Sequence, residues 1–87
     1  MKKIEKKCWS KYFNKIKSGD KTFEVRLADW KCNIGDILVL KEWNPEKNKF
    51  TGRVIEKKIT YVAKTKDFKF FTEEEVKKYG FQIIGFK

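Results

Sequence analysis

The hydrophobic positions near the N-terminus first follow the pattern of an edge strand and then that of a helix. Residues 2–8 are mostly charged and predict an edge strand, where charged side chains protect the unpaired backbone. Four large apolar side chains then recur at i, i+3, i+4 and i+7, the spacing of one helix face: Trp9, Tyr12, Phe13 and Ile16. Gly19 follows, and a glycine at this point can end a helix in the left-handed conformation.

The middle of the chain alternates between apolar and polar residues, which is typical of strands. In residues 22–27, three apolar side chains would face one way and three polar ones the other: Phe23, Val25 and Leu27 against Thr22, Glu24 and Arg26. Two further strands are predicted over residues 37–43 and 53–64. The hairpin between them contains Pro45, which can set its first turn.

The last third of the chain contains an aromatic and basic loop, a helix and a strand. Thr72 and Glu75 have the spacing of a capping box, which predicts a short helix over residues 73–79 that Gly80 closes. Residues 81–87 then predict a final strand. The expected order is β-α-β-β-β-α-β, in a single domain of the α+β class with mainly β structure.

Short connections between most of these elements favour antiparallel pairing. A twisted sheet of this kind can close into a small β-barrel, with the two short helices covering its ends. The chain has eight Phe, three Tyr and three Trp among 87 residues, and each aromatic side chain removes roughly 150–250 Å² from water when it is buried. This aromatic content can hold a small core without a metal or a disulfide.

The composition also narrows the chemistry. The chain has no histidine, which excludes Ser–His and Cys–His nucleophile pairs and removes the commonest metal ligand. Cys8 and Cys32 form neither a Cys-x-x-Cys pair nor a zinc spacing, so we expect free thiols, no metal and no cofactor. No apolar run approaches the ~20 residues that span a bilayer, and no signal peptide is evident. We therefore expect a cytoplasmic protein without a membrane partner.

The net charge of +10 favours a polyanionic partner, nucleic acid above all. The lysines are spread along the whole chain, so they could equally serve solubility. Only two of the 22 basic residues are arginines, Arg26 and Arg53, and arginine offers a planar fork suited to carboxylate or phosphate. Arg53 could contact phosphate or brace the predicted hairpin.

The segment GDKTFEVR gathers the most suggestive polar residues of the chain: Gly19, Lys21, Glu24 and Arg26. Glu24 and Arg26 could form a surface ion pair, which contributes about 0–1 kcal/mol to stability, with Lys21 beside it. They could also line a polar cleft, in which a half-buried glutamate acts as acid or base and a desolvated lysine acts as nucleophile. Without chemistry, the glutamate could accept hydrogen bonds from a base edge while the two cations hold a nucleic-acid backbone.

Exposed tryptophans could add stacking to such a site. Trp30 lies in a polar loop just after the motif, and a base stacked on an aromatic ring contributes about 1–3 kcal/mol. Trp9, Tyr12 and Trp43 are weaker candidates for stacking because core packing explains large aromatic residues equally well. The loop that contains Phe68, Phe70 and Phe71 could bind nucleic acid or fold back as a cap on the barrel.

The spacing G-x-K-x-x-E-x-R over residues 19–26 resembles the signature of the ASCH domain family, which has a PUA-like fold. The wider chain resembles small, largely uncharacterised bacterial and phage members. The resemblance extends from CWSKYFNKIKSGDKTFEVR through NIGDILVLKEWNPEKNKFTGR to ITYV and the closing FQIIGFK. It covers most of the chain.

The resemblance implies a PUA-like barrel with a cleft between the first helix and the barrel, lined by Lys21, Glu24 and Arg26. The family is usually proposed to bind RNA. Some members are amidohydrolases that remove the acyl group from N4-acetylcytidine; they use the motif lysine, have threonine where this chain has Glu24, and use a glutamate from a distal helical segment. The comparable acidic residues here are Glu73, Glu74 and Glu75.

These observations lead to three hypotheses. The first is a module that binds RNA or a modified nucleoside, with Gly19, Lys21, Glu24, Arg26, Trp30 and Arg53 as its binding residues. The second is an amidohydrolase acting on N4-acetylcytidine or a related acylated base, with Lys21 and Glu24 catalytic. The third is a protein-interaction module. We expect a monomer in each case.

Overall fold

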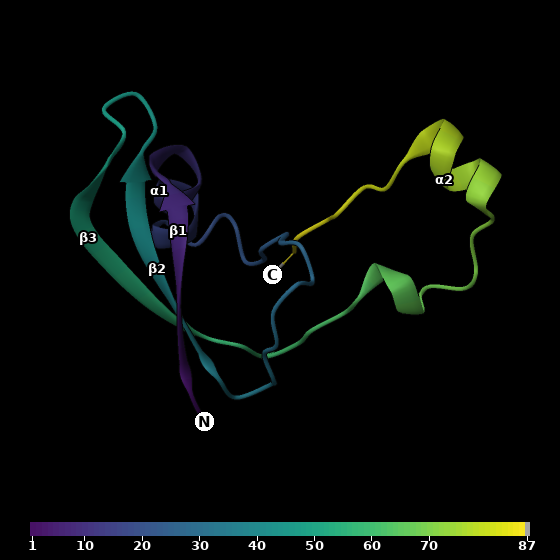
Figure 1. Ribbon diagram of the computed structural model, residues 1–87, viewed down its shortest axis with the longest axis horizontal. Helices are drawn as coiled ribbons and strands as arrows, with labels where there is room; N and C mark the ends of the chain where they lie inside the picture. Colours follow the sequence, from purple (N-terminus) through teal and green to yellow (C-terminus); the bar gives the residue numbers. More distant parts are fainter. Residues whose placement is uncertain (87) are drawn as a thin grey trace.

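The computed structural model describes residues 1–86 and shows a small α+β domain (Figure 1). Its elements are β1 (Lys3–Trp9), α1 (Ser10–Lys17), β2 (Ile37–Asn44), β3 (Lys49–Lys58), the 3-10 turn η1 (Thr65–Asp67) and α2 (Glu73–Tyr79). The three strands and α1 form one body, and the C-terminal third of the chain leaves this body as an arm that carries η1 and α2 (Figure 1).

The sheet has the order β1-β2-β3 and is mixed. β2 and β3 pair antiparallel through the predicted hairpin, whereas β1 and β2 pair parallel, with Lys3 opposite Ile37 and Trp9 opposite Trp43. The expected antiparallel pairing is therefore wrong for β1. The reason is that α1 and the residues after it carry the chain back along β1, so that β2 starts beside the beginning of β1 and runs in the same direction.

The core lies between α1 and the inner face of the sheet. Five side chains form its buried part: Cys8, Phe13, Ile16, Leu38 and Leu40. The predicted helical stripe is half right, because Phe13 and Ile16 are buried but Trp9 and Tyr12 are exposed. Trp9 is exposed because it still belongs to β1 and follows the alternation of that strand rather than the spacing of the helix.

The end of α1 and the start of α2 both follow the local sequence signals. Gly19 has a φ of 86°, and its N–H donates to the carbonyl of Ile16, which closes α1 as predicted. At α2, the Thr72 side chain accepts from the N–H of Glu75 while the Glu75 side chain accepts from the N–H of Thr72, so the capping box is confirmed.

The other two expected strands are not formed, and β3 ends at Lys58 rather than at residue 64. Residues 22–27 do not pair with a neighbouring strand. Their polar side chains make the contacts of this segment, which are described below. Residues 81–86 are likewise not a strand, and residue 87 of that expected strand lies outside the described residues. The sheet of residues 1–86 is thus three-stranded.

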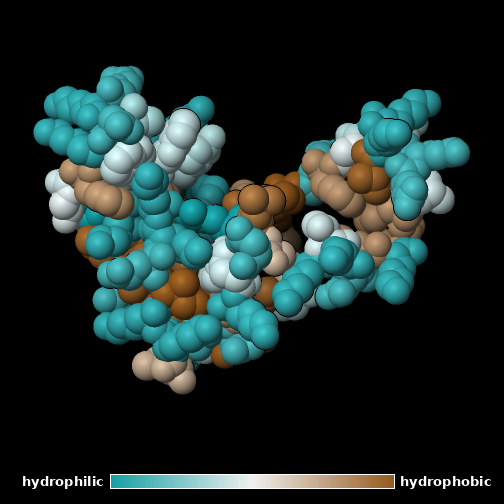
Figure 2. Space-filling model, in the orientation of Figure 1, coloured by the Kyte–Doolittle hydropathy of each residue, from teal (hydrophilic) through white to brown (hydrophobic). Residues whose placement is uncertain are grey.

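The arm has an aromatic cluster of its own. Phe68, Phe70, Phe71 and Phe81 contact one another with ring centroids 4.8–5.8 Å apart. The returning chain then passes Phe23 at Gly85, where a side chain would bring its Cβ to 2.7 Å from the phenylalanine ring. A notch separates the arm from the sheet, and hydrophobic residues lie at its base (Figure 2).

Candidate functional site

The GDKTFEVR segment lies along the free edge of β1. The turn at Gly19 reverses the chain after α1, and the N–H of Lys21 donates to the carbonyl of Lys15 at 3.0 Å. Further along, the guanidinium of Arg26 donates to the carbonyl of Lys7 at 2.8 Å. Because β1 is an edge strand, this carbonyl has no partner strand on that side, and Arg26 satisfies it.

Lys21, Glu24 and Arg26 meet in one polar cluster, as the motif predicts. The ammonium of Lys21 donates to Oε1 of Glu24 at 2.7 Å. Arg26 reaches the other oxygen, Oε2, with its Nε at 2.9 Å and a terminal nitrogen at 2.8 Å. Both carboxylate oxygens are therefore held by cations, and the cluster carries a net charge of about +1.

The cluster is half-buried. The side chains of Lys21, Glu24 and Arg26 are 19%, 18% and 28% exposed. The Lys21 ammonium also lies 5.5 Å from the ring centroid of Tyr12 and 5.0 Å from that of Phe23, within the range of cation–π attraction. Partial burial weakens screening by water, so these ion pairs contribute more than a fully exposed pair would.

A cleft of about 380 Å³ opens on one side of the cluster, and it is lined by all three charged residues together with Trp30 and Tyr61. Leu38 and Leu40 of the sheet also line it. A second hollow on the other side is lined by the same three charged residues with Lys7, Trp9 and Tyr12. An apolar cleft with a few convergent polar groups is the usual form of a small-ligand site.

Trp30 lines the cleft but is not fully free for stacking. It packs against the core, and the Lys6 ammonium lies 4.1 Å from its ring centroid. A ligand entering the cleft would meet the part of the indole that remains accessible. The structure therefore places Trp30 at the cleft wall, beside the charged cluster that the motif predicts.

Cys8 lies next to this cluster, on the inner face of β1. Burial raises the pKa of its thiol, and the nearby Glu24 carboxylate raises it further, while Arg26 and Lys21 act in the opposite direction. A raised pKa keeps the thiol protonated and weakly nucleophilic at neutral pH. Cys8 is thus a buried apolar neighbour of the site rather than a reactive group.

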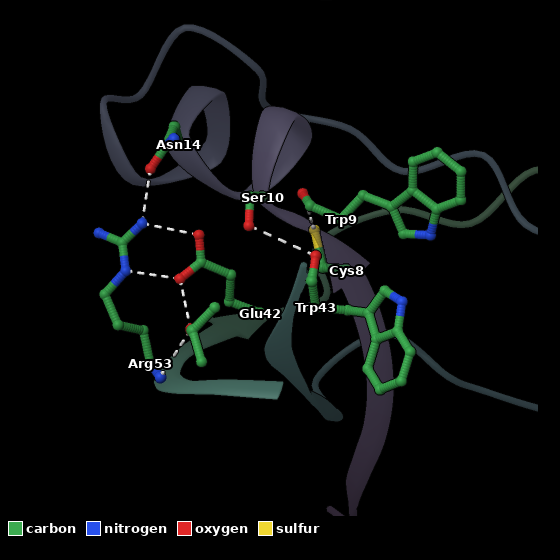
Figure 3. A network of polar contacts seen from close by, with 8 residues as sticks. Cys8, Trp9, Ser10, Asn14, Glu42, Trp43 and Arg53 are labelled. Carbon is green, nitrogen blue, oxygen red and sulfur yellow. Dashed lines mark hydrogen bonds and ion pairs between the residues drawn. The ribbon is translucent and has the colours of Figure 1, made fainter. Parts of the chain in front are cut away.

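Arg53, the other arginine, lies in a separate network with the buried Glu42 (Figure 3). Glu42 is only 3% exposed. Arg53 donates its Nε to Oε1 at 2.6 Å and a terminal nitrogen to Oε2 at 2.8 Å, and the same nitrogen donates to Asn14 of α1 at 2.8 Å. Thr51 donates its hydroxyl to Oε1 of Glu42. The network ties α1 to β2 and β3, which favours the bracing role for Arg53.

The tripeptide Thr51-Gly52-Arg53 explains how this network forms. The β2–β3 register shifts between Lys41 and Trp43, and Gly52 has a φ of 95°, a conformation that costs glycine little. This irregularity lets Thr51 and Arg53 reach the same carboxylate from one strand.

The Glu42 network makes stability depend on pH in a definite direction. Hydrogen bonds from Arg53 and then from Thr51 lower the pKa of Glu42 from 4.5 to about 2. Because the folded-state pKa is the lower one, the stabilisation is fully present above the unfolded-state value and is lost as the pH falls toward about 2. We expect the stability advantage of the wild type over Glu42→Gln to shrink steadily as the pH is lowered through this range.

Urea denaturation of both proteins from neutral pH down to about pH 3 measures this effect. The pKa values of Asp36 and Glu75 are also lowered, each by backbone hydrogen bonds first. Those two groups remain in Glu42→Gln, so the difference between the two proteins isolates Glu42. If the difference in the free energy of unfolding between the wild type and Glu42→Gln stayed constant across this pH range, the lowered pKa of Glu42 would be contradicted.

Glu42 is the residue that the sequence interpretation missed. A signal for it exists, because it is the one acidic residue in the strand ILVLKEW and it shares a strand face with Leu38 and Leu40. An acidic residue at a buried position requires a partner. Its partner Arg53 lies across the irregular part of the hairpin, which the sequence pattern does not reveal.

The acidic residues of α2 do not reach the cleft in this structure. Glu73, Glu74 and Glu75 begin α2 on the arm, away from β1 and α1 (Figure 1). Across residues 1–86, no group of three or more Cys, Asp or Glu side chains is arranged to hold a metal ion. Within the same residues, neither helix is long and apolar enough to cross a bilayer.

The fold and the site thus define a small α+β domain with a charged, half-buried cluster at the mouth of a cleft. The chain belongs to the family described as a domain of unknown function, DUF3850, whose model matches residues 4–79. No curated protein and no solved structure matches this chain.

Proposed function

We propose that this domain binds RNA or a modified nucleoside at the cleft beside Lys21, Glu24 and Arg26. The observation that carries the proposal is the Glu24 carboxylate, which is fixed by a cation on each oxygen at the cleft wall. A carboxylate held in this way offers its remaining lone pairs to an amino group on a base edge, as acidic side chains do for cytosine. In this proposal, Lys21 and Arg26 contact a neighbouring phosphate.

The proposal includes an ASCH-like site on a PUA-like barrel. Its support is the motif spacing, the order β1-α1-β2-β3 and the cleft between α1, the motif segment and the chain beyond β3. A closed barrel would need further strands from residues 22–27 and 81–86, which form no strand in this structure. Slow amide exchange in both segments would favour the barrel, because exchange is slow only where the amides are hydrogen-bonded and protected.

An NMR titration of the labelled protein tests the binding proposal. The probes are cytidine, N4-acetylcytidine and a short single-stranded RNA. We expect shifts at residues 19–26 and at Trp30 with at least one of them. Shifts that avoid this segment with all three probes would contradict the proposed site.

RNA binding is expected to depend strongly on salt. If Lys21, Arg26 and neighbouring lysines contact phosphates, binding releases counterions, and the affinity falls about tenfold or more between ~50 mM and ~200 mM salt. Fluorescence anisotropy with a labelled single-stranded RNA at both salt concentrations measures the fall. An unchanged affinity would show that phosphate contacts do not drive binding.

An amidohydrolase is the second candidate, favoured by the 2.7 Å contact between Lys21 Nζ and Glu24 Oε1. Glu24 is within reach to take a proton from Lys21, which could then remove a proton from water. The hydroxide would attack the acetyl carbonyl of N4-acetylcytidine, the bond between that carbon and N4 would break, and N4 would take up a proton. The products are acetate and cytidine.

Turnover is the decisive measurement for this candidate. We expect an amidohydrolase to release cytidine from N4-acetylcytidine, and Lys21→Ala to lower the rate at least ~100-fold, the low end of the contribution of a general base. Chromatography of the products at high protein concentration detects even slow turnover. Equal rates for the wild type and Lys21→Ala would exclude a catalytic role for this lysine.

The protein-interaction hypothesis also has one observation in its favour. The arm exposes the large apolar side chains of Phe70 and Tyr79, and its helix α2 lies away from β1 and α1 (Figure 1). Exposed apolar residues on one segment are typical of interaction surfaces. A partner bound there would leave the cleft open, so this role is compatible with the first proposal.

A further inference from the structure

The outer face of the sheet, opposite α1, carries a row of three aromatic side chains that runs across all three strands. Trp9 of β1 is opposite Trp43 of β2, and Trp43 is opposite Phe50 of β3. Residues directly opposite each other in a sheet project from the same face. The indoles of Trp9 and Trp43 lie on the side of the strands away from Glu42 and Arg53 (Figure 3).

Two of these rings are exposed, and Trp43 between them is partly buried. Trp9 is 51% exposed and Phe50 is 48% exposed. Trp43 and Phe50 meet edge to face, with centroids 4.9 Å apart, which explains this pair as a cross-strand contact. The position of the Trp9 ring on this face is not explained by such a contact, because no other ring among residues 1–86 stacks on it. The buried core, in contrast, contains a single aromatic residue, Phe13.

A basic row lies next to the aromatic row. Lys7 of β1 is opposite Lys41 of β2. The Lys7 ammonium lies 3.7 Å from the ring centroid of Trp43, and the Lys41 ammonium lies 5.5 Å from that of Phe50. Lys41 is also 3.8 Å from a carboxylate oxygen of Glu5. Lys7 makes no ion pair within residues 1–86, so its charge is available to an anion.

The two rows are continuous with the charged cleft. Lys7 contributes to both places, because its carbonyl accepts from Arg26 while its ammonium lies over Trp43. The second hollow beside the cluster is lined by Lys7 and Trp9 as well as by Lys21 and Glu24. A polymer leaving the cleft can therefore pass over the edge of β1 onto the outer face.

We propose that the outer face of the sheet binds single-stranded RNA, with unpaired bases stacked on Trp9, Trp43 and Phe50 and with phosphates held by Lys7 and Lys41. Aromatic side chains interleaved with cations are the way proteins bind single strands without base pairing. On binding, Lys7 moves from the Trp43 ring to a phosphate. A stacked base replaces the exposed cation–π contact with a stronger interaction.

This inference deepens the proposed function and takes its ligand from it, but it concerns different residues. The cleft takes one base, and the outer face takes the nucleotides next to it. Affinity therefore increases with the length of the RNA beyond a single nucleoside. Duplex RNA gains nothing from the outer face because its bases are already stacked and paired.

The test compares the variant Trp9→Leu/Phe50→Leu with the wild type and with the control Phe70→Leu/Tyr79→Leu. The control removes two exposed aromatic rings from the arm. The ligands are labelled octauridylate and octacytidylate, measured by anisotropy at low salt. We expect Trp9→Leu/Phe50→Leu to weaken octamer binding at least about tenfold, the effect of one lost stacking contact, while the control binds as the wild type does.

A second measurement guards against a folding defect in the double variant. In Trp30→Phe, only Trp9 and Trp43 remain as indoles, so quenching of the tryptophan emission by the octamer reports stacking on the outer face directly. Lys7→Gln keeps all three rings and should weaken octamer binding without changing the fold. We expect quenching with the octamer and little with a duplex of the same length.

The outcomes separate this inference from the proposed cleft function. Equal octamer affinities in all the variants, with no quenching in Trp30→Phe, would overturn the outer-face proposal and leave nucleoside shifts at residues 19–26 as evidence for the cleft. Quenching by the octamer that persists in Trp30→Phe/Lys21→Ala, without any nucleoside shifts at residues 19–26, would support the outer face and remove the cleft from RNA binding. Quenching by duplex and octamer alike would contradict stacking of unpaired bases.

Discussion

Arg53→Ala should destabilise this domain by more than the loss of an exposed salt bridge does, because it leaves the buried Glu42 carboxylate without its charged partner although the Arg53 side chain itself is 45% exposed. The carboxylate of Glu42 is buried, and Arg53 supplies both of its bidentate hydrogen bonds. Loss of this partner leaves Thr51 as the remaining strong donor. Urea denaturation at neutral pH, with the midpoint and the slope both fitted, measures the loss.

The double variant Glu42→Leu/Arg53→Met is the matched control. It removes both charges and fills their space with apolar groups, so it should be much more stable than Arg53→Ala although it changes more atoms. Arg53→Lys should lie between the wild type and Arg53→Ala, because lysine supplies charge without the bidentate fork. A loss below about 1 kcal/mol in Arg53→Ala would mean that the pair behaves like a surface salt bridge.

If the cleft binds a base as proposed, Glu24→Ala should abolish base discrimination there and at the same time strengthen nonspecific RNA binding. The substitution removes the proposed acceptor for a base amino group and releases two cations, Lys21 and Arg26, from their ion pairs. We expect the preference between cytidine and uridine to fall about tenfold, the lower end of what one good base contact provides. Affinity for a mixed-sequence octamer at low salt should rise, because the local charge becomes more positive.

Glu74→Ala is the control for net charge. It also removes one negative charge, but from α2 on the arm. It should change the cytidine preference little and raise octamer affinity less than Glu24→Ala does. Glu24→Gln keeps the size of the side chain and one acceptor oxygen, so its loss of discrimination should be smaller. Retained discrimination in Glu24→Ala would show that another group reads the base.

Local signals predicted most of the regular structure. The stop at Gly19 and the capping box of Thr72 and Glu75 were predicted correctly because each depends on residues a few positions apart. The alternation in residues 22–27 predicted a strand that the structure does not form. Here the charged residues satisfy one another and the carbonyl of Lys7 on the edge of β1, and a pattern cannot distinguish this arrangement from strand pairing.

The candidate site was predicted in part. The motif placed Lys21, Glu24 and Arg26 together, because residues within six positions of one another can meet without knowledge of the fold. The Glu42–Arg53 pair depends on a register shift between two strands, and the outer aromatic row depends on the pairing of β1 with β2. Both depend on how the strands pair, so they became visible only with the register and topology of the sheet.

The reactivity of the buried Cys8 thiol can report local opening of the core. Its side chain lies between α1 and the sheet, and burial raises the pKa of the thiol. A thiol-specific reagent can therefore react with Cys8 only when the packing around its side chain opens. Under native conditions the rate of labelling at Cys8 follows the free energy of that opening, whereas Cys32, at the cleft wall, is already partly accessible. The two cysteines thus distinguish motion of the core from motion at the cleft within one molecule.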